Sequence, residues 1–162
     1  MTTSSTHRNV SFNEPVDDET FSFEPPEGAE LKETTTPDMT EFDSVSAANE
    51  ATAYEVVEPD MPDGYTVESI QEMVIDGTST TSLSYRNGDK GAYYSVSNES
   101  VGSESAAGSD GESVTIGNTT GTVSSYGETT SVRWSCDGMR YSLSGQLNQS
   151  TLVEAASAVG CS

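Results

Sequence analysis

The chain has 162 residues, with 27 Asp plus Glu against 6 Lys plus Arg, and a formal net charge of -21. This length fits one domain, and no stretch approaches the roughly 20 consecutive apolar residues that a membrane-spanning helix needs. So large an excess of anions repels phosphates and anionic lipid headgroups, which excludes nucleic-acid binding and charge-driven binding to a membrane surface.

The distribution of the charge favours a salt-adapted folded protein over a disordered acidic chain. Few large aliphatic residues together with a high net charge are typical of disorder. Disordered acidic chains usually keep many lysines, however, whereas this chain has only Lys32 and Lys90 and spreads its carboxylates along the whole length. Since high salt screens self-repulsion within a few ångströms, we expect a halophilic source and unfolding of the protein on desalting.

Two short strands and a linker are predicted before residue 44. The alternating apolar runs at 10–12 and 21–23 read as strands, but a lone pair of strands is marginal in water. Residues 33–43, with a Thr run followed by Pro37, are predicted to form a linker. No basic region followed by an apolar run, the mark of a secretory signal, is visible. If the start of the chain is the true start, the protein stays in the cytoplasm.

A short helix is predicted over 44–51, with Ser44 as its N-cap. The Pro-rich segment that follows, closed by Gly64, reads as a rigid turn. From Tyr65 onward the apolar residues alternate with a period of two, which predicts an antiparallel sheet of hairpins. A shift of this alternation suggests a bulge near Ser69. Hairpin turns are predicted at Asn87-Gly88, Gly117-Asn118 and Asp137-Gly138.

The hairpins 80–97 and 129–144 share a pattern of Ser and Thr alternating with apolar residues. An internal duplication would produce such an echo, and so would the alternation of small polar residues alone. In both cases two hairpins of one type are expected, and the second is expected to belong to the core sheet.

The chain ends in a predicted helix over 151–159, in which Thr151 and Glu154 have capping-box spacing and Gly160 can end the helix. Its narrow apolar face must pack on the sheet to be stable. The predicted fold is therefore α+β: a mainly antiparallel sheet carrying this helix and the short helix near 44–51, preceded by a poorly ordered segment. The residues expected to form the core are Tyr65, Leu83, Tyr85, Tyr94, Val132, Trp134, Tyr141, Leu143, Leu152 and Val159.

The residue types argue against catalysis and against metal binding. The only histidine is His7, close to the amino terminus, which excludes His-dependent nucleophilic catalysis in practice. Two cysteines without a second pair do not make a zinc site, and the chain contains neither a phosphate-binding Gly-rich loop nor a calcium-binding loop. We expect no catalytic residues, no cofactor and no metal, and we interpret the acidic residues as solvated surface carboxylates.

The two cysteines leave two alternatives open. Cys136 is predicted on the core face of its strand, and Cys161 follows the end of the last helix. If that helix crosses the sheet in an oxidising compartment, the sulfurs can form a disulfide that closes a loop of about 25 residues. Otherwise they are two buried free thiols.

One segment carries a family resemblance. Residues 21–28 read Phe-Ser-Phe-Glu-Pro-Pro-Glu-Gly, and within the stretch 9–30 they resemble the carboxyl-terminal end of LolA- and RseB-like lipoprotein-carrier domains, where the last strands end in Phe-x-Phe-x-Pro-Pro-x-Gly. Residues 44–160 are similar to the small uncharacterised domain that often follows such a carrier domain in exported lipoproteins of haloarchaea and Gram-positive bacteria. The features that match are Pro62-Asp63-Gly64-Tyr65, Leu83-Ser84-Tyr85, Trp134 with Asp137-Gly138 and Tyr141, and the final helix.

The resemblance implies a domain order and a function. Residues 1–32 would be the end of a carrier-like domain, 33–43 a linker, and 44–162 a small α+β domain, located outside the cytoplasm at the cell envelope. Most of a carrier barrel is missing, so no lipid cavity is expected. The expected function is a non-catalytic accessory domain that binds an envelope protein or a lipid through its sheet. The alternative is a regulatory sensor domain of the RseB or anti-sigma-associated type.

Overall fold

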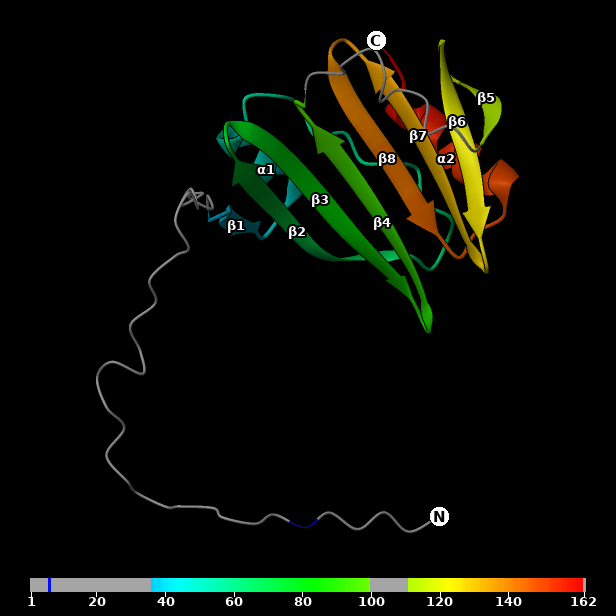
Figure 1. Ribbon diagram of the computed structural model, residues 1–162, viewed down its shortest axis with the longest axis horizontal. Coiled ribbons are helices and arrows are strands. Elements are labelled where there is room, and N and C mark those ends of the chain that lie inside the picture. The colour runs from blue at the N-terminus through cyan, green and yellow to red at the C-terminus, as the bar shows by residue number, and fades with distance from the viewer. Residues whose placement is uncertain (1–5, 7–35, 100–110, 162) are drawn as a thin grey trace, which may run out of the picture. The chain divides into compact units, whose positions relative to one another are not determined.

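In the part of the chain that the structure describes, the backbone forms one antiparallel sheet of eight strands with two helices (Figure 1). The computed structural model describes Thr6 and residues 36–99 and 111–161. In chain order the elements are β1 (Asp38–Phe42), α1 (Val45–Ala51), β2 (Thr66–Ile75), β3 (Thr78–Asn87), β4 (Lys90–Ser97), β5 (Glu112–Ile116), β6 (Thr119–Tyr126), β7 (Thr129–Cys136), β8 (Met139–Gly145) and α2 (Gln149–Val159). The predicted α+β class is therefore confirmed.

The sheet consists of two four-stranded meanders that meet at its centre. The strand order is β1-β2-β3-β4-β8-β7-β6-β5, so each meander begins at an edge and ends beside the other, with β4 antiparallel to β8. The two hairpins with the shared Ser/Thr pattern are β3–β4 and β7–β8, which supply the four central strands. The outer strands of the sheet are β1 and β5.

The predicted bulge and two of the three predicted turns fix the register; the turn predicted at Asn87-Gly88 is formed instead by Gly88 and Asp89, because Asn87 pairs with Lys90. Asp137 and Gly138 both have positive φ, as a two-residue type I′ turn requires, and join β7 to β8. Asp76 and Gly77 make the same kind of turn between β2 and β3. The register of β2 against β3 shifts between Val67 and Ser69, which confirms the bulge.

Side-chain caps determine where the helices begin. The Ser44 hydroxyl accepts a hydrogen bond of 3.2 Å from the Ala47 N–H, which confirms Ser44 as the N-cap of α1. Helix α2 begins two residues earlier than predicted, at Gln149. Its N-cap is Asn148, whose side-chain oxygen accepts hydrogen bonds from both the N–H and the hydroxyl of Thr151, each 2.9 Å long. Asn148 caps more strongly than Thr, so Thr151 lies inside the first turn of the helix.

One face of the sheet, the inner face, holds the core. Helix α2 packs against β5, β7 and β8, and α1 packs against β1 and β2. Between α1 and β2, the segment 52–65 is held by Asn49, whose amide exchanges two hydrogen bonds with the backbone of Val56. Trp134 and Tyr141 lie opposite each other on β7 and β8 with their rings stacked 5.2 Å apart. Of the residues predicted for the core, Tyr65 and Tyr141 are partly buried against it; the buried ones are Leu83, Tyr85, Tyr94, Val132, Trp134, Leu143, Leu152 and Val159.

The end of the predicted linker is a strand. Residues 38–42 form β1, which pairs with β2 over its whole length, Asp38 opposite Val74 and Phe42 opposite Ile70. The sequence gives little sign of this strand because Asp and Glu are depleted in strands; backbone pairing with an already formed β2 stabilises it instead. The strands predicted at 10–12 and 21–23, and with them the carrier-like segment, lie outside the described residues.

Candidate binding face of the sheet

The second face of the sheet has a composition unlike that of the rest of the chain. We call the outward-pointing positions of β2 to β8 the open face, because the core, α1 and α2 lie on the inner side of these strands. By the register of the strand pairs, the positions of the open face are Thr66, Ser69, Gln71, Met73, Ile75, Thr78, Thr80, Ser82, Ser84, Arg86, Gly91, Tyr93, Ser95, Ser97, Ser113, Thr115, Thr120, Thr122, Ser124, Tyr126, Thr129, Ser131, Arg133, Ser135, Arg140, Ser142 and Ser144.

No Asp or Glu occupies any of these open-face positions, although the chain has 27 acidic residues. The described carboxylates lie instead on β1, on the helices, in turns and loops, at the β2 bulge, and at Glu72 and Glu112 on the inner side of the strands. Two of them reach the rim of the open face, and each is held there by an arginine. On the same side of the sheet, Glu41 of edge strand β1 lies opposite Gln71, so the exclusion of free carboxylates holds for β2 to β8 and not for the edge strand.

All three arginines in the described residues point to the open face. Arg86 pairs with Glu68 at 3.1 Å, and Arg140 pairs with Glu99 at 2.7 Å. Arg133 is exposed, and no ion pair of its guanidinium is seen within residues 36–99 and 111–161. It lies opposite Ser142, one outward position away from Arg140 on the neighbouring strand. Since Arg140 is already paired with Glu99, Arg133 is the arginine of this face that can offer its charge to an anionic group of a ligand.

Large apolar side chains are also exposed on this side of the sheet. Tyr93 is 46% exposed, and its hydroxyl donates a 2.5 Å hydrogen bond to Ser82, which holds the ring in place. Tyr126 on β6 is 93% exposed. Met73 on β2 lies opposite Met39 of β1, and both are exposed.

A shallow depression lies beside Tyr93. Its volume is about 390 Å³, and its lining includes Ser84, Arg86, Thr129, Ser144 and Gln146. These side chains offer hydroxyl, amide and guanidinium groups to a ligand, and the Tyr93 ring offers an apolar contact. Such a surface suits a partner with both polar and aromatic groups, whereas an acyl chain needs continuous apolar walls.

The part of the chain that carries the open face matches a known domain family. A family model described as "Domain of unknown function (DUF4367)" matches residues 55–159, well over half of the chain. The chain belongs to this family. The DUF4367 match includes β2 to β8 and α2, so the open face lies within the family domain, while β1 and α1 precede it.

Similarity of the chain to curated proteins and to solved structures is limited. No curated protein matches the chain. A solved structure, the crystal structure of MucB in complex with MucA(peri), is similar over 62% of this chain and 34% of that chain, with 16% sequence identity and a TM-score of 0.41. The chain thus spans about a third of the length of that MucB chain.

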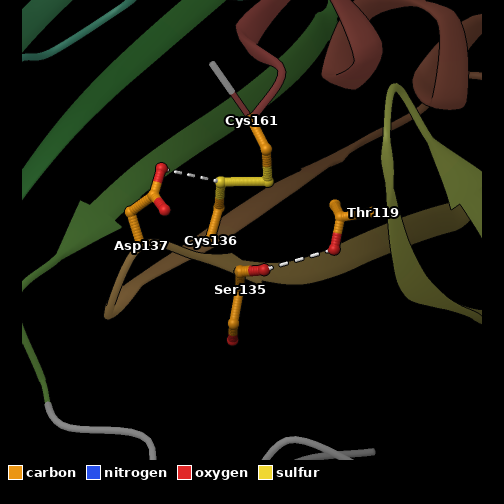
Figure 2. Close-up of a disulfide and its surroundings, with 5 residues drawn as sticks. All are labelled: Thr119, Ser135, Cys136, Asp137 and Cys161. Atoms are coloured by element: carbon orange, nitrogen blue, oxygen red, sulfur yellow. Dashed lines mark hydrogen bonds between the residues drawn. A yellow bond between two sulfur atoms is a disulfide. The ribbon is translucent and has the colours of Figure 1, made fainter.

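A disulfide fastens α2 at the edge of the inner face. Cys136 at the end of β7 is bonded to Cys161, with their Cα atoms 5.7 Å apart (Figure 2). Figure 2 also shows the Asp137 carboxylate beside the Cys136 sulfur, at 3.5 Å, and the Thr119 hydroxyl, which donates to the Ser135 carbonyl at 3.4 Å. Of the two alternatives for the cysteines, the structure has the disulfide. It joins the end of the helix to the strand that carries Trp134, so it maintains the core that supports the open face.

The inner face contains a polar network with a structural role. The Tyr54 hydroxyl lies 2.9 Å from the hydroxyls of Ser79 and Thr81, and the Ser79 hydroxyl donates a 2.5 Å hydrogen bond to Glu72. Thr81 is fully buried, so these bonds satisfy polar groups that burial has removed from water. The network therefore secures the segment 52–65 on the sheet.

Buried tyrosines surround the network. Desolvation raises the pKa of Tyr94, and the neighbouring hydroxyls of Tyr141, Tyr85 and Tyr54 raise it further. Burial, then the nearby Glu58 carboxylate, raises the pKa of Tyr85. Both hydroxyls stay protonated at any physiological pH, which rules them out as bases in this state.

No group of three or more His, Cys, Asp or Glu side chains in the described ranges is arranged to hold a metal ion. No described helix is both long and apolar enough to cross a membrane.

Sequence reasoning expected binding through the sheet but did not identify the open face or its residues, although their signal was present. Alternation along each strand assigns its residues to one face or the other, and the outward-pointing positions of β2 to β8 contain no Asp or Glu. The inward-pointing apolar positions identify the core, but they give no information on the composition of the outward-pointing ones.

Proposed function

We propose that this DUF4367 domain is a non-catalytic protein-binding module that docks its partner on the open face. The observation that carries the proposal is the exclusion of acidic side chains from this face. A carboxylate at the centre of an interface loses its hydration without a counter-charge, which costs several kcal/mol. Strand propensity also disfavours Asp and Glu, but it acts equally on β1, which keeps Asp38 and Glu41.

The residues that replace the carboxylates support the same proposal. Tyr, Met and Arg are enriched at protein interfaces, whereas Glu, Asp and Lys are depleted, as is Ser, which is abundant on the open face. Ser and Thr lose little side-chain entropy when they are buried, and Tyr gives a large contact area with few rotatable bonds. We propose Tyr93 as the energetic centre of the interface, because its ring is already fixed by Ser82 and borders the depression.

Several finer points belong to the proposal as well. We place the domain outside the cytoplasm, because disulfides persist in oxidising compartments and the chain has one between Cys136 and Cys161. A halophilic archaeal source follows from the acidic, lysine-poor composition. Association with a lipid- or lipoprotein-carrier domain rests on the resemblance of residues 9–30. A protein is preferred to a lipid as the partner because the depression on the open face mixes apolar surface with charged and polar side chains, among them Glu68 and Arg86, where an acyl chain needs continuous apolar walls.

Site-specific photo-crosslinking in the native host tests the proposal. A photoreactive phenylalanine analogue at position 93 should give one discrete adduct, whereas the same analogue at the exposed Ala158 of α2 should give none. Adding Ser131→Asp, which places a carboxylate in the middle of the open face, should abolish the adduct while the circular dichroism spectrum of the protein stays unchanged. Adducts of equal yield at both positions, or an adduct insensitive to Ser131→Asp, would refute the proposal.

A further inference from the structure

The two edges of the sheet differ in how well they are protected against pairing with another strand. An edge strand presents unpaired backbone N–H and C=O groups, and folded proteins usually guard such edges with charged residues or proline. Edge strand β1 carries Asp38 and Glu41 and is preceded by Pro37. Edge strand β5 has one charged residue, Glu112 at its first position, followed by Ser113, Val114, Thr115 and Ile116. By this criterion β1 is guarded and β5 is not.

A groove lies alongside β5. Its volume is about 610 Å³, and its lining consists of Val114, Thr115, Asn148, Gln149, Ser150 and Val153. Strand β5 and helix α2 thus form the two walls, and Val114 and Val153, both partly exposed, supply apolar surface. A strand added to the edge of a sheet lies about 4.8 Å from its neighbour and points alternate side chains to the same face. Every second side chain of an added strand would therefore lie over this groove.

The sequence of β5 is complementary to itself in antiparallel pairing. With Val114 opposite Val114 of a second copy, Ser113 lies opposite Thr115 and Glu112 opposite Ile116. No carboxylate then faces another carboxylate, two hydroxyl residues face each other, and the valine pair sits over the groove. If β1 paired with β1 of a second copy in the same way, with Thr40 opposite Thr40, the ten paired residues would include four carboxylates, those of Asp38 and Glu41 from each copy.

We propose that a second copy of this chain pairs with β5, giving a twofold-symmetric dimer with a continuous sheet. The two α2 helices then lie on the same side of the joined sheet, so that Val153 of each copy borders a shared groove. Twofold dimers of this kind use one patch on both subunits. This inference rests on the β5 edge alone and is independent of the proposed role of the open face.

The size and charge of the interface set its strength. Five residues of paired backbone and one shared groove make an interface below the standard size, so we expect a dissociation constant on the order of 10–100 µM. Each copy carries a net charge of -21, and salt screens their mutual repulsion. The dimer should therefore become tighter as the salt concentration rises.

Analytical ultracentrifugation of the full chain in 0.5 M and 3 M KCl tests the proposal. The wild-type protein should convert from monomer to dimer with increasing concentration, and more completely in 3 M KCl. Val114→Glu should give a monomer, because two carboxylates would meet at the symmetry axis. Val114→Lys should do the same, and mixing the two variants should restore a heterodimer. Thr40→Glu, at the centre of the other edge, is the matched control and should dimerise like the wild type.

Each of three results would overturn the proposal. A wild-type chain that stays monomeric at several hundred micromolar in 3 M KCl has no such interface. A dimer lost in Thr40→Glu but kept in Val114→Glu uses β1. A dimer insensitive to both changes but lost in Tyr93→Glu uses the open face. The mixing experiment guards against misfolding, since unfolded single variants would not associate when combined.

Discussion

Replacing Tyr94 by phenylalanine should make the protein more stable, the reverse of the usual effect of a change in the core. Tyr94 is 0% exposed at the centre of β4. Its hydroxyl has no hydrogen-bond partner among the described residues. A buried polar group without a partner costs about 1–3 kcal/mol, and deleting the group recovers that cost. Since Tyr94→Phe keeps the ring and loses only an oxygen atom, we expect the free energy of unfolding to rise by about 1 kcal/mol at pH 7.

The same substitution should reduce the sensitivity of the protein to alkali. Burial raises the pKa of Tyr94, and also those of Tyr85 and Tyr141, above the value of about 10 expected for an unfolded chain. The folded state then holds these protons more tightly than the unfolded state. Stability is therefore complete below pH 10 and falls as the pH rises above it, by about 1.4 kcal/mol per pH unit for a fully buried tyrosine such as Tyr94 and by less for the partly exposed Tyr141. In Tyr94→Phe, the free energy of unfolding should therefore fall less steeply with pH above pH 10, because one of the tyrosines that lose a proton on unfolding is gone.

Urea denaturation at constant high salt, carried out at pH 7 and at pH 11, measures both effects. Tyr93→Phe is the matched control, one position away on the other face. The Tyr93 hydroxyl has a partner, Ser82, so its removal should lower the free energy of unfolding by about 0.5–1.5 kcal/mol at pH 7. A Tyr94→Phe variant less stable than the wild type at pH 7, or one with an unchanged alkaline slope, would refute the reasoning.

Three further measurements test the rest of the structure. Replacing both Cys136 and Cys161 by serine removes a constraint of 25 residues of sequence separation, and in the chain-entropy model this lowers the free energy of unfolding by about 3.5 kcal/mol; urea denaturation with an unchanged m-value and a loss below about 1 kcal/mol would contradict it. Asn148→Ala should cost about 1 kcal/mol through loss of the α2 cap, whereas Ser150→Ala, a control in the same turn, should cost less in the same assay. Dialysis into tens of millimolar salt should unfold the protein if the halophilic prediction holds, and an unchanged circular dichroism spectrum would count against it.

The sequence predicts the parts of this fold that short-range patterns determine. Type I′ turns need residues that tolerate positive φ, so Asp137-Gly138 identifies its hairpin without any knowledge of the rest of the sheet. The bulge near Ser69 is visible because it shifts the apolar phase of β2. Strand β1 was missed because it depends on pairing with a strand some thirty positions away, and Asp38 and Glu41 oppose strand propensity. The start of α2 was placed too late because Thr151 and Glu154 mimic a capping box that Asn148 makes unnecessary.

The candidate site depends on knowing the faces and edges of the sheet. Alternation assigns Tyr93 and Arg133 to the side opposite the core, but their shared surface exists only once β4, β8 and β7 are neighbours. That order comes from the joining of β4 to β8, whose residues are distant in sequence. The difference between the two edges likewise becomes visible only when β1 and β5 are known to be the outer strands. Long-range strand pairing therefore decides both proposals, and no local pattern contains it.

The predicted salt adaptation and the proposed role of the open face together lead to one conclusion about recognition. At 1 M salt the Debye length is about 3 Å, so the large negative charge of this chain cannot steer a partner from a distance in the environment that its composition predicts. Association must then depend on groups that touch: the Tyr93 ring, the hydroxyls around it, and arginines that pair with a carboxylate only at contact. Under that condition, a change at Tyr93 should weaken binding far more than reversing the charge of an exposed residue remote from the open face, such as Glu154. At low salt the effects of the two changes on binding should differ less, because long-range repulsion would then affect every approach to the protein.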